Sequence, residues 1–368
     1  MESKVKNRIL SISMLIFLVG MSGWFIFRTP DEYSYSERRV LKQKPVFSME
    51  EFLDGEYGKK YEDYALDQFP LRDNLRGIKA ISENYIFNKA DNNGIIFKEG
   101  HLSKIEYPLK ESMLEYAGNR FEFIYKKYLM KKDIEPYFVI VPDKNYYLGQ
   151  KRNILTMDYE KLYKQMYKKT SYMKHIDIRS HLILEDYYYT DTHWRQEKIG
   201  DIAKLIADKM GTKVDADYKK VVCKEPFYGV YVGQSALKVT PDKLVYLTDD
   251  TLKKCSVLCY DTGMPVKKEL YDMDKLKSKD MYEVFLSGAV ALLTIENPQA
   301  SSDKELIMFR DSFGSSLAPL LVEGYKKITM VDIRYINSDV LDAFIEFNDQ
   351  DVLFVYSTLL LNSSLGIR

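Results

Sequence analysis

The sequence is poor in the residues that build disulfide and metal sites. It contains three cysteines and four histidines among 368 residues. Cys223, Cys255 and Cys259 lack the paired Cys-x-x-Cys spacing of a zinc site, and an odd, sparse set does not make a disulfide framework. Two interpretations stay open for them: one disulfide in an exported chain, or buried apolar thiols.

An excess of charge of either sign is also absent. Lysine plus arginine and aspartate plus glutamate number 54 each. Because no net charge draws the chain to a polyanion, nucleic-acid binding is not expected. The sequence also shows no internal repeat and no low-complexity tract.

One long apolar run is present near the N-terminus. Residues 9–27 carry no charge, which suits a helix long enough to cross the hydrocarbon layer. Lysines and an arginine precede the run, and acidic residues follow Arg28, so the positive-inside rule places residues 1–8 in the cytoplasm and the rest outside. We predict an uncleaved, single-pass anchor in the cell membrane. A cleaved signal peptide is the alternative, although Ser22-Gly23-Trp24 makes a poor cleavage site.

Apolar runs of strand length alternate with helical patterns in the rest of the chain. Residues 28–108 are expected to form a stalk and an N-terminal extension, and residues 109–368 the main domain. Strands are expected at 137–141, 176–178, 306–309, 328–333 and 352–356, and helices at 109–132, 157–169, 194–210, 315–325 and 338–347. This alternation predicts a parallel α/β sandwich.

Residues 212–302 break the alternation. Glycines and prolines punctuate short apolar runs there, which predicts an insertion rich in β-strands and loops. The insertion separates His193 from Ser312, and we expect it to lean over the functional site.

Asp191 and His193 stand two residues apart in Asp191-Thr192-His193-Trp194, which puts both side chains on one side of an extended segment. Ser312 follows the predicted strand at 306–309 and precedes a helix. An acid, an imidazole and a hydroxyl are the parts of a nucleophilic triad. The alternative is that Asp191 and Ser312 only cap helices.

Asp-Thr-His-Trp, followed later by Arg310-Asp311-Ser312-Phe313, resembles the DHHW family. That family is a branch of the SGNH hydrolase superfamily and is related to periplasmic alginate O-acetyltransferases. Further short motifs agree, in the order Ser36 to Leu41, Asp67 to Arg72, Val141 to Lys144 and Met330 to Tyr335. The resemblance implies an SGNH-like, flavodoxin-like three-layer sandwich with a parallel central sheet, and catalysis by Ser312, His193 and Asp191.

Two departures from the superfamily pattern concern the serine block and the oxyanion site. Arg310 stands where the serine block usually begins with glycine, and Gly288-Ala289 stands where related sequences tend to show Gly-Asn. The backbone N–H groups of Phe313 and Gly314, at the start of a helix, are candidate oxyanion donors, with Arg310 as a further candidate. Lys144, after a predicted core strand, could contact the acceptor or the oxyanion, or could be a solvated loop lysine.

The resemblance implies an envelope O-acyltransferase that moves an acyl group, typically acetyl, to a polysaccharide or cell-wall polymer. The acyl donor would come from a membrane-bound O-acyltransferase partner. A carbohydrate acetyl esterase with the same triad and a non-catalytic glycan-binding protein are the alternatives. No cofactor is expected. No metal is expected either, because His101, His175 and His181 show no ligand spacing around Asp191 and His193.

Overall fold

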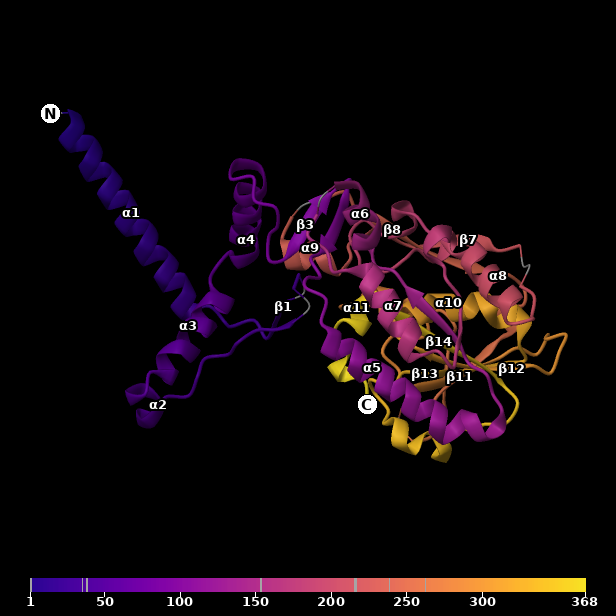
Figure 1. Cartoon of the computed structure of the whole chain (residues 1–368). Helices are drawn as coiled ribbons and strands as arrows, with labels where there is room; N and C mark the ends of the chain where they lie inside the picture. Colours follow the sequence, from indigo (N-terminus) through magenta and orange to yellow (C-terminus); the bar gives the residue numbers. More distant parts are fainter. Residues whose placement is uncertain are drawn as a thin grey trace. The chain divides into compact units, whose positions relative to one another are not determined.

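The computed structural model describes residues 2–34, 36–37, 39–152, 154–214, 217–237, 239–261 and 263–368. The chain divides into two compact units (Figure 1). One unit comprises Met1–Asn93 with Val232–Lys238, and the other comprises Gly94–Tyr231 with Val239–Arg368.

The first unit consists of helices and one short β-ribbon. Its elements are α1 (Glu2–Phe27), β1 (Tyr33–Ser34) paired antiparallel with β2 (Arg39–Val40), α2 (Met49–Leu53), α3 (Glu56–Gln68), α4 (Arg72–Ile81) and the π-helical turn η1 (Ser82–Ile86). Lys4–Phe27 of α1 is long and apolar enough to cross a membrane, and none of its most apolar stretch is buried. A single membrane-spanning anchor is therefore indicated, although a signal sequence has the same length and composition.

The second unit is built on an eight-stranded sheet with the order β10-β9-β11-β13-β12-β14-β5-β6. The five strands from β13 to β6 are parallel. Their bounds are β5 (Tyr137–Val141), β6 (Lys174–His175), β12 (Glu305–Arg310), β13 (Lys327–Val331) and β14 (Asp351–Ser357). In place of the strand predicted at 176–178, the structure has the shorter β6 just before these residues. β6 lies at the edge of the sheet and pairs with β5 alone.

Three strands of the segment 212–302 extend this sheet. β9 (Ser256–Cys259), β10 (Val266–Lys268) and β11 (Leu292–Glu296) add to it antiparallel beside β13. Two separate antiparallel ribbons complete the unit: β3 (Ile95–Lys98) with β4 (His101–Lys104), and β7 (Lys219–Phe227) with β8 (Asp242–Thr248). The segment predicted as a β- and loop-rich insertion is therefore partly a continuation of the central sheet.

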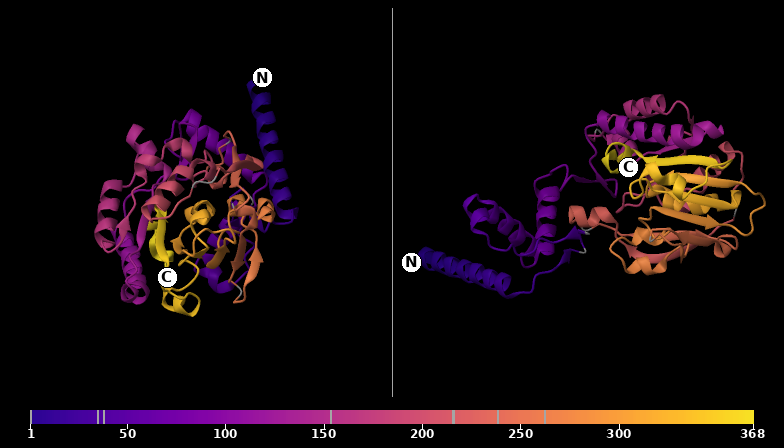
Figure 2. Two further views of the ribbon diagram at one scale, coloured as in Figure 1. Left: turned by 90° about the vertical axis from the view of Figure 1, so that its right-hand side faces the viewer. Right: turned by 90° about the horizontal axis from the view of Figure 1, so that it is seen from below.

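Successive side chains of a strand point to opposite faces of the sheet, so alternate residues of the central strands are buried in two separate cores. In β5, Val139 and Val141 belong to the core that contains Ile202 and Leu317, whereas Phe138 belongs to the core that contains Phe121. α8 (Gly200–Lys209) and α10 (Phe313–Leu321) cover the first face, and α5 (Glu111–Ile124) and α7 (Tyr159–Lys169) cover the second. Figure 2 shows the sheet between these helical layers. The three-layer α/β sandwich predicted from the sequence is confirmed.

The remaining helices are α6 (Lys144–Arg152), α9 (Val230–Ser235) and α11 (Thr358–Leu361). The helix expected at 338–347 is a 3-10 segment, η11 (Ser338–Ala343), whose backbone departs from helical angles at Val340. The helical pattern at 194–210 begins as a 3-10 turn, η6 (Gln196–Lys198), before α8. The first difference replaces a predicted helix by a short 3-10 segment and the second lies at an element boundary, and both leave the layers unchanged.

Candidate active site

Asp191, His193 and Ser312 lie in one hydrogen-bonded row. The Nδ1 atom of His193 is 2.6 Å from Oδ1 of Asp191, and Nε2 of His193 is 2.8 Å from Oγ of Ser312. With the proton on Nδ1, the imidazole donates to the carboxylate and accepts from the hydroxyl. The structure thus brings together the three residues that the sequence motifs singled out.

Ser312 follows the carboxyl end of β12 and stands directly before α10. It occupies the N-cap position, but its side chain makes no capping hydrogen bond, so its hydroxyl is available to His193. Asp191 does not cap α8, the helix that follows it in the chain, because α8 begins only at Gly200. Capping alone therefore does not account for the two side chains, because both contact the imidazole of His193.

A tight loop fixes the acid and the imidazole. Tyr187 and Trp194 form an isolated antiparallel bridge, and the N–H of Tyr188 donates to the carbonyl of His193 over 3.1 Å. Inside the loop, both carboxylate oxygens of Asp242 accept hydrogen bonds from the backbone N–H groups of Tyr189 and Thr190 at 2.8 Å. This loop, residues 187–194, is here called the histidine loop. Hydrogen bonds close its ends and support its centre, and so hold the side chains of Asp191 and His193 in place.

Backbone N–H groups hold both oxygens of the Asp191 carboxylate. The N–H of Val230, at the start of α9, donates to its Oδ2 over 2.9 Å, and the N–H of His193 donates to its Oδ1 over 3.2 Å. Gly229, the residue before Val230, packs tightly against Asp191. A Cβ on Gly229 would lie 2.3 Å from the Cβ of Asp191. Residues of the predicted insertion therefore orient the acid.

The ring of Tyr282 stacks on the imidazole of His193, with the ring centroids 3.7 Å apart and an interplanar angle of 3°. The Tyr282 hydroxyl lies 2.8 Å from the hydroxyl of Ser316, which also accepts a hydrogen bond from the indole Nε1 of Trp194 at 2.9 Å. Ser316 lies one turn after Ser312 on α10. Tyr282 and Trp194 thus connect the histidine loop to the helix that follows the serine.

Access to the row is limited to its serine end. Asp191 and His193 are buried, at 1% and 6% exposure, whereas Ser312 is partly exposed. Tyr282 and Phe313 close off the imidazole. A substrate reaching the row meets the hydroxyl of Ser312 first.

The predicted oxyanion donors Phe313 and Gly314 already have acceptors. The N–H of Phe313 donates to Oδ1 of Asp311 at 3.0 Å, and the N–H of Gly314 donates to the carbonyl of Asp311 at 3.1 Å. Within the described ranges, the N–H of Ser312 itself donates to no other group. In the structure as it stands, Ser312 rather than its two successors offers a backbone donor.

Arg310 is a buried structural residue. Its guanidinium lies 3.4 Å from Oδ2 of Asp332 and donates to the carbonyls of Gly288 and Val290 at 3.3 Å. A Cβ on Gly314 would lie 2.6 Å from the Cβ of Arg310, so the arginine stem packs beneath the start of α10. Arg310 supports the backbone around the site and is not placed to meet a substrate.

Lys144 fits neither of its two sequence interpretations. It is 1% exposed, and its ammonium donates to the carbonyls of Leu102 and Tyr188, the latter at 2.9 Å. Burial lowers the pKa of Lys144 to about 7, against the opposing effect of Asp191 and Asp242. An interior lysine satisfies its donors on backbone carbonyls. Lys144 therefore supports the histidine loop through the carbonyl of Tyr188.

The loop around Gly288-Ala289, where the resemblance led us to look for Gly-Asn, has an unusual backbone. Leu286, Ser287 and Gly288 all have positive φ, at 55°, 59° and 77°. The hydroxyl of Ser287 donates to Oδ2 of Asp272 over 2.8 Å. The loop is tied to the site through the bond from Arg310 to the carbonyl of Gly288.

The cysteines and the other histidines lie apart from this row. Cys223, Cys255 and Cys259 are free thiols, which excludes the disulfide interpretation for this structure. His101 is buried with a pKa lowered to about 3, chiefly by burial, and His175 stacks on Tyr167. Among the residues that the structure describes, no group of three or more His, Cys, Asp or Glu could hold a metal ion.

A cavity of about 740 Å³ lies at the other end of the sheet. Its lining includes Glu305, Lys327 and Asp351, which are the first residues of β12, β13 and β14. Ser312 follows the opposite, carboxyl end of β12. The cavity is therefore separate from the candidate site, which lies where parallel α/β sheets place their sites.

No family model and no curated protein matches the sequence. The structure is similar to that of a DHHW family protein from Eubacterium siraeum, at 18% identity and a TM-score of 0.57, over 75% of this chain and 95% of that one. It is also similar to PatB1 from Bacillus cereus, at 21% identity and a TM-score of 0.61, over 73% of this chain and 96% of that one. A second PatB1 structure, with a sulfonyl adduct, gives 20% identity and a TM-score of 0.59 over 73% and 95%. The chain therefore has the fold of these proteins, and the DHHW-like fold that its motifs imply is confirmed.

Proposed function

We propose that the protein is an O-acyltransferase of the cell envelope that uses Ser312 as nucleophile, His193 as general base and acid, and Asp191 to orient His193. The observation that carries the proposal is the row of two hydrogen bonds, 2.6 Å and 2.8 Å, that joins the three side chains across the fold. Both distances are within the reach that proton transfer needs.

In the first half of the reaction, Oγ of Ser312 attacks the acyl carbonyl carbon while its proton passes to Nε2 of His193. The tetrahedral intermediate collapses, His193 returns the proton to the leaving group, and an acyl-serine ester remains. In the second half, a hydroxyl of the acceptor attacks this ester, and its proton passes to Nε2. Collapse then returns the proton to Oγ of Ser312, which releases the acylated acceptor and restores the enzyme.

The acid and the stacked tyrosine keep the imidazole in one orientation throughout. Asp191 accepts the Nδ1 proton, which fixes the tautomer that leaves Nε2 free to take a proton. The N–H of Ser312 is the backbone donor that we assign to the oxyanion, because those of Phe313 and Gly314 are engaged with Asp311. A single such donor supplies less stabilisation than the usual two or three, which favours a slow enzyme.

The motif resemblance supports acetyl as the acyl group and a polysaccharide or cell-wall polymer as the acceptor. The apolar helix α1 supports a site outside the cytoplasm, next to a membrane-bound O-acyltransferase that would deliver the acyl group. Esterase activity would need only water in place of the acceptor, because both reactions share the acyl-serine.

The test is to incubate the full chain in detergent micelles with a chromogenic acetyl ester, with and without oligosaccharide acceptors. Acetylated sugar supports transfer, and free acetate alone supports an esterase. Ser312→Ala is expected to abolish both products. Ser315→Ala is the matched control, because Ser315 lies on the same helix and its buried hydroxyl has no hydrogen-bond partner.

A reactive sulfonyl fluoride tests the nucleophile without any acceptor. We expect one sulfonyl group per chain, located by mass spectrometry on the peptide that contains Ser312, and none in His193→Ala. The proposed mechanism would be rejected if Ser312→Ala were labelled at the wild-type rate. It would also be rejected if the wild-type protein neither turned over the ester nor reacted with the sulfonyl fluoride, and a glycan-binding role would then remain.

A further inference from the structure

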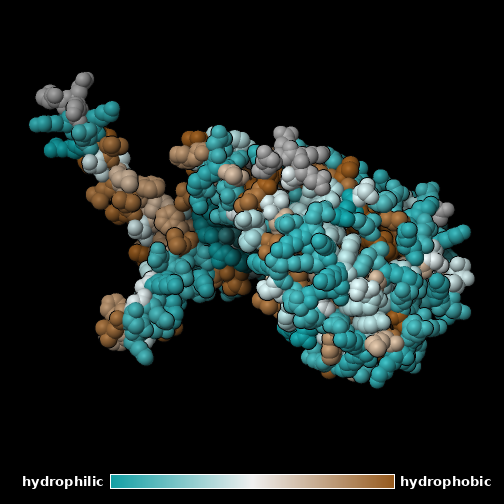
Figure 3. Space-filling model, in the orientation of Figure 1, coloured by the Kyte–Doolittle hydropathy of each residue, from teal (hydrophilic) through white to brown (hydrophobic). Residues whose placement is uncertain are grey.

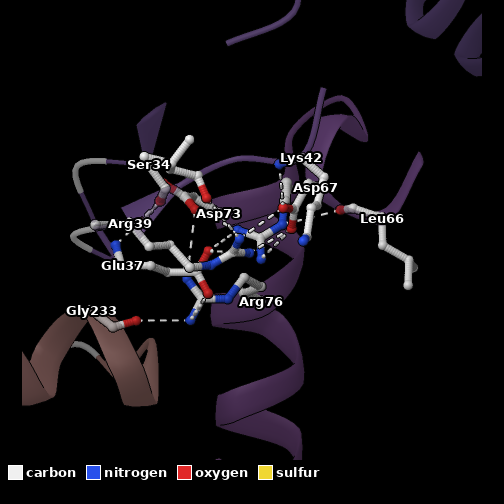
Figure 4. A network of polar contacts seen from close by, with 12 residues as sticks. Ser34, Glu37, Arg39, Lys42, Leu66, Asp67, Asp73, Arg76 and Gly233 are labelled. Carbon is white, nitrogen blue, oxygen red and sulfur yellow. Dashed lines mark hydrogen bonds and ion pairs between the residues drawn. The ribbon is translucent and has the colours of Figure 1, made fainter. Parts of the chain in front are cut away.

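Two sequence motifs that the active site does not use meet in the first unit. One contains Glu37 and Arg39, and the other runs from Asp67 to Arg72; Arg38, within the first motif, lies outside the described residues. The guanidinium of Arg39 donates two hydrogen bonds to the carboxylate of Asp67, one of them at 2.7 Å, and the N–H of Lys42 adds a third at 2.9 Å (Figure 4). This ion-pair network fixes β2 against the end of α3.

Two arginines of α4 extend the network inward. Arg72 donates to Glu37, and Arg76, one turn further along, lies 3.4 Å from the same carboxylate and donates to the carbonyl of Gly233 at 2.8 Å (Figure 4). Burial raises the pKa of Glu37, but the hydrogen bond from Arg72 and the surrounding arginine charges hold it below its usual value. The polar side of α4 is therefore the side that is packed against the rest of the unit.

The apolar side of α4 faces outward as a consequence. Leu71, Leu75, Ile78, Ile81 and Tyr85 recur every three or four residues along α4 and η1, so they form one stripe, here called the α4 apolar stripe. These side chains are between 44% and 66% exposed. A surface helix of a soluble protein shows the reverse arrangement, with its apolar side in the core.

Figure 3 shows hydrophobic residues gathered at the end of α4 as well as along α1. Ile86 and Phe87, directly after the stripe, are 71% and 69% exposed and enlarge the apolar surface at this end. A contiguous exposed patch of this kind marks an interaction surface.

We propose that the α4 apolar stripe lies in the interface of the lipid bilayer, beside the membrane-spanning helix α1. The end of α1 is joined to the segment that leads into the stripe. Phe25 packs on Tyr64 of α3, with ring centroids 5.5 Å apart, and Arg28 donates to the carbonyl of Gln68 at 3.2 Å. The stripe begins three residues after Gln68, so it starts at the level where the chain leaves the membrane.

The charges around the stripe suit a lipid surface. Lys79, on α4, and Lys89, after η1, are exposed and lie close to the apolar residues in the sequence, and Nζ of Lys89 pairs with the carboxylate of Glu83 at 2.8 Å. Basic side chains next to an apolar helix side are the pattern of helices that lie in the interface, where the apolar residues enter the acyl boundary and the cations meet anionic headgroups. Membrane attachment through the stripe does not depend on the proposed chemistry. Two attachments, α1 and the stripe, would hold the first unit in one orientation on the membrane.

The experiment places a fluorescent reporter of polarity on single cysteines of the full chain in lipid nanodiscs. Cys223, Cys255 and Cys259 are first replaced by alanine, and Ile78→Cys or Ile81→Cys then carries the label. Asp73→Cys is the matched control, because Asp73 is an exposed residue of α4 outside the stripe. The nanodiscs contain phosphatidylcholine and phosphatidylglycerol, with or without spin-labelled lipid as a quencher.

We expect blue-shifted emission at positions 78 and 81, and quenching by spin-labelled lipid several-fold stronger than at position 73. Water-like emission at all three positions would overturn the proposal. So would blue-shifted emission without lipid quenching, because that result would mean that a second copy or another protein covers the stripe. Unchanged near-UV circular dichroism of each labelled chain checks that the fold is intact.

Discussion

The ring of Tyr282 lies parallel to the imidazole of His193, 3.7 Å from it. Tyr282 comes from the 3-10 helix η9 (Met281–Val284), in the segment that separates the histidine from the serine. Its hydroxyl meets Ser316 on α10, so one side chain spans the two halves of the site. Stacked aromatic pairs of this kind contribute about 0.5–1.5 kcal/mol beyond their buried area.

Loss of the Tyr282 ring should therefore loosen the imidazole. We expect Tyr282→Leu to lower kcat/KM by about tenfold, which is the rate equivalent of about 1.4 kcal/mol, and Tyr282→Phe to retain most activity because it keeps the stacked ring. The imidazole proton resonances of His193 should also shift in Tyr282→Leu as the ring current disappears, a change that does not depend on turnover. Equal activity and equal resonances in the two variants would exclude a positioning role.

Gly229 should tolerate no side chain, because a Cβ there would lie 2.3 Å from the Cβ of Asp191 and 2.5 Å from the carbonyl oxygen of Thr190. Gly229→Ala is expected to displace the acid and lower kcat by about a hundredfold, the effect of a misplacement of roughly 1 Å. Gly200→Ala is the control, since a Cβ at Gly200 meets nothing within 4 Å. A Gly229→Ala enzyme as active as Gly200→Ala would show that the position of Asp191 does not matter.

Lys144 should make stability depend on pH. Burial lowers its pKa from 10.5 to about 7 in the folded protein, so between these values the unfolded chain binds a proton that the folded chain does not. Stability from this group therefore increases as pH rises through this range, by about 2 kcal/mol between about pH 7 and pH 9. The free energy of unfolding of wild type minus that of Lys144→Met, measured by denaturant titration, should increase with pH. A difference independent of pH would contradict the assignment.

Arg310 should matter for stability and little for chemistry. Arg310→Met removes donors from the carbonyls of Gly288 and Val290 and is expected to cost about 1–3 kcal/mol, seen as a lower Tm. Asp332 keeps its bonds to Arg334, at 2.6 and 2.8 Å, so no unpaired buried carboxylate is left. The folded variant should react with a sulfonyl fluoride at nearly the wild-type rate. A large loss of reactivity at unchanged Tm would instead place Arg310 in the catalytic machinery.

The sequence by itself determined the layers of the main domain and the residues of the candidate row. Strand-length apolar runs at 137–141, 306–309, 328–333 and 352–356 can be buried on both faces only between helices, so a parallel sandwich follows from the pattern. Asp191 and His193 stand two residues apart in an extended segment, and Ser312 stands at a strand-to-helix turn. Because these features depend only on neighbouring residues, the sequence alone predicts them.

The tertiary structure alone decided which side chains support that row and which do not. Tyr282 lies in an irregular segment with no motif, and its place on His193 depends on how that segment folds back over the sheet. Lys144 and Arg310 were candidates for contact with the acceptor or the oxyanion, with a solvated loop lysine as the alternative for Lys144. Burial turns their donors to backbone carbonyls instead, because an interior cation must be hydrogen-bonded. The outward apolar side of α4 likewise depends on the distant Glu37, whose carboxylate holds Arg72 and Arg76 inward. Periodicity gives a helix its two sides, but only long-range contacts decide which side faces the protein.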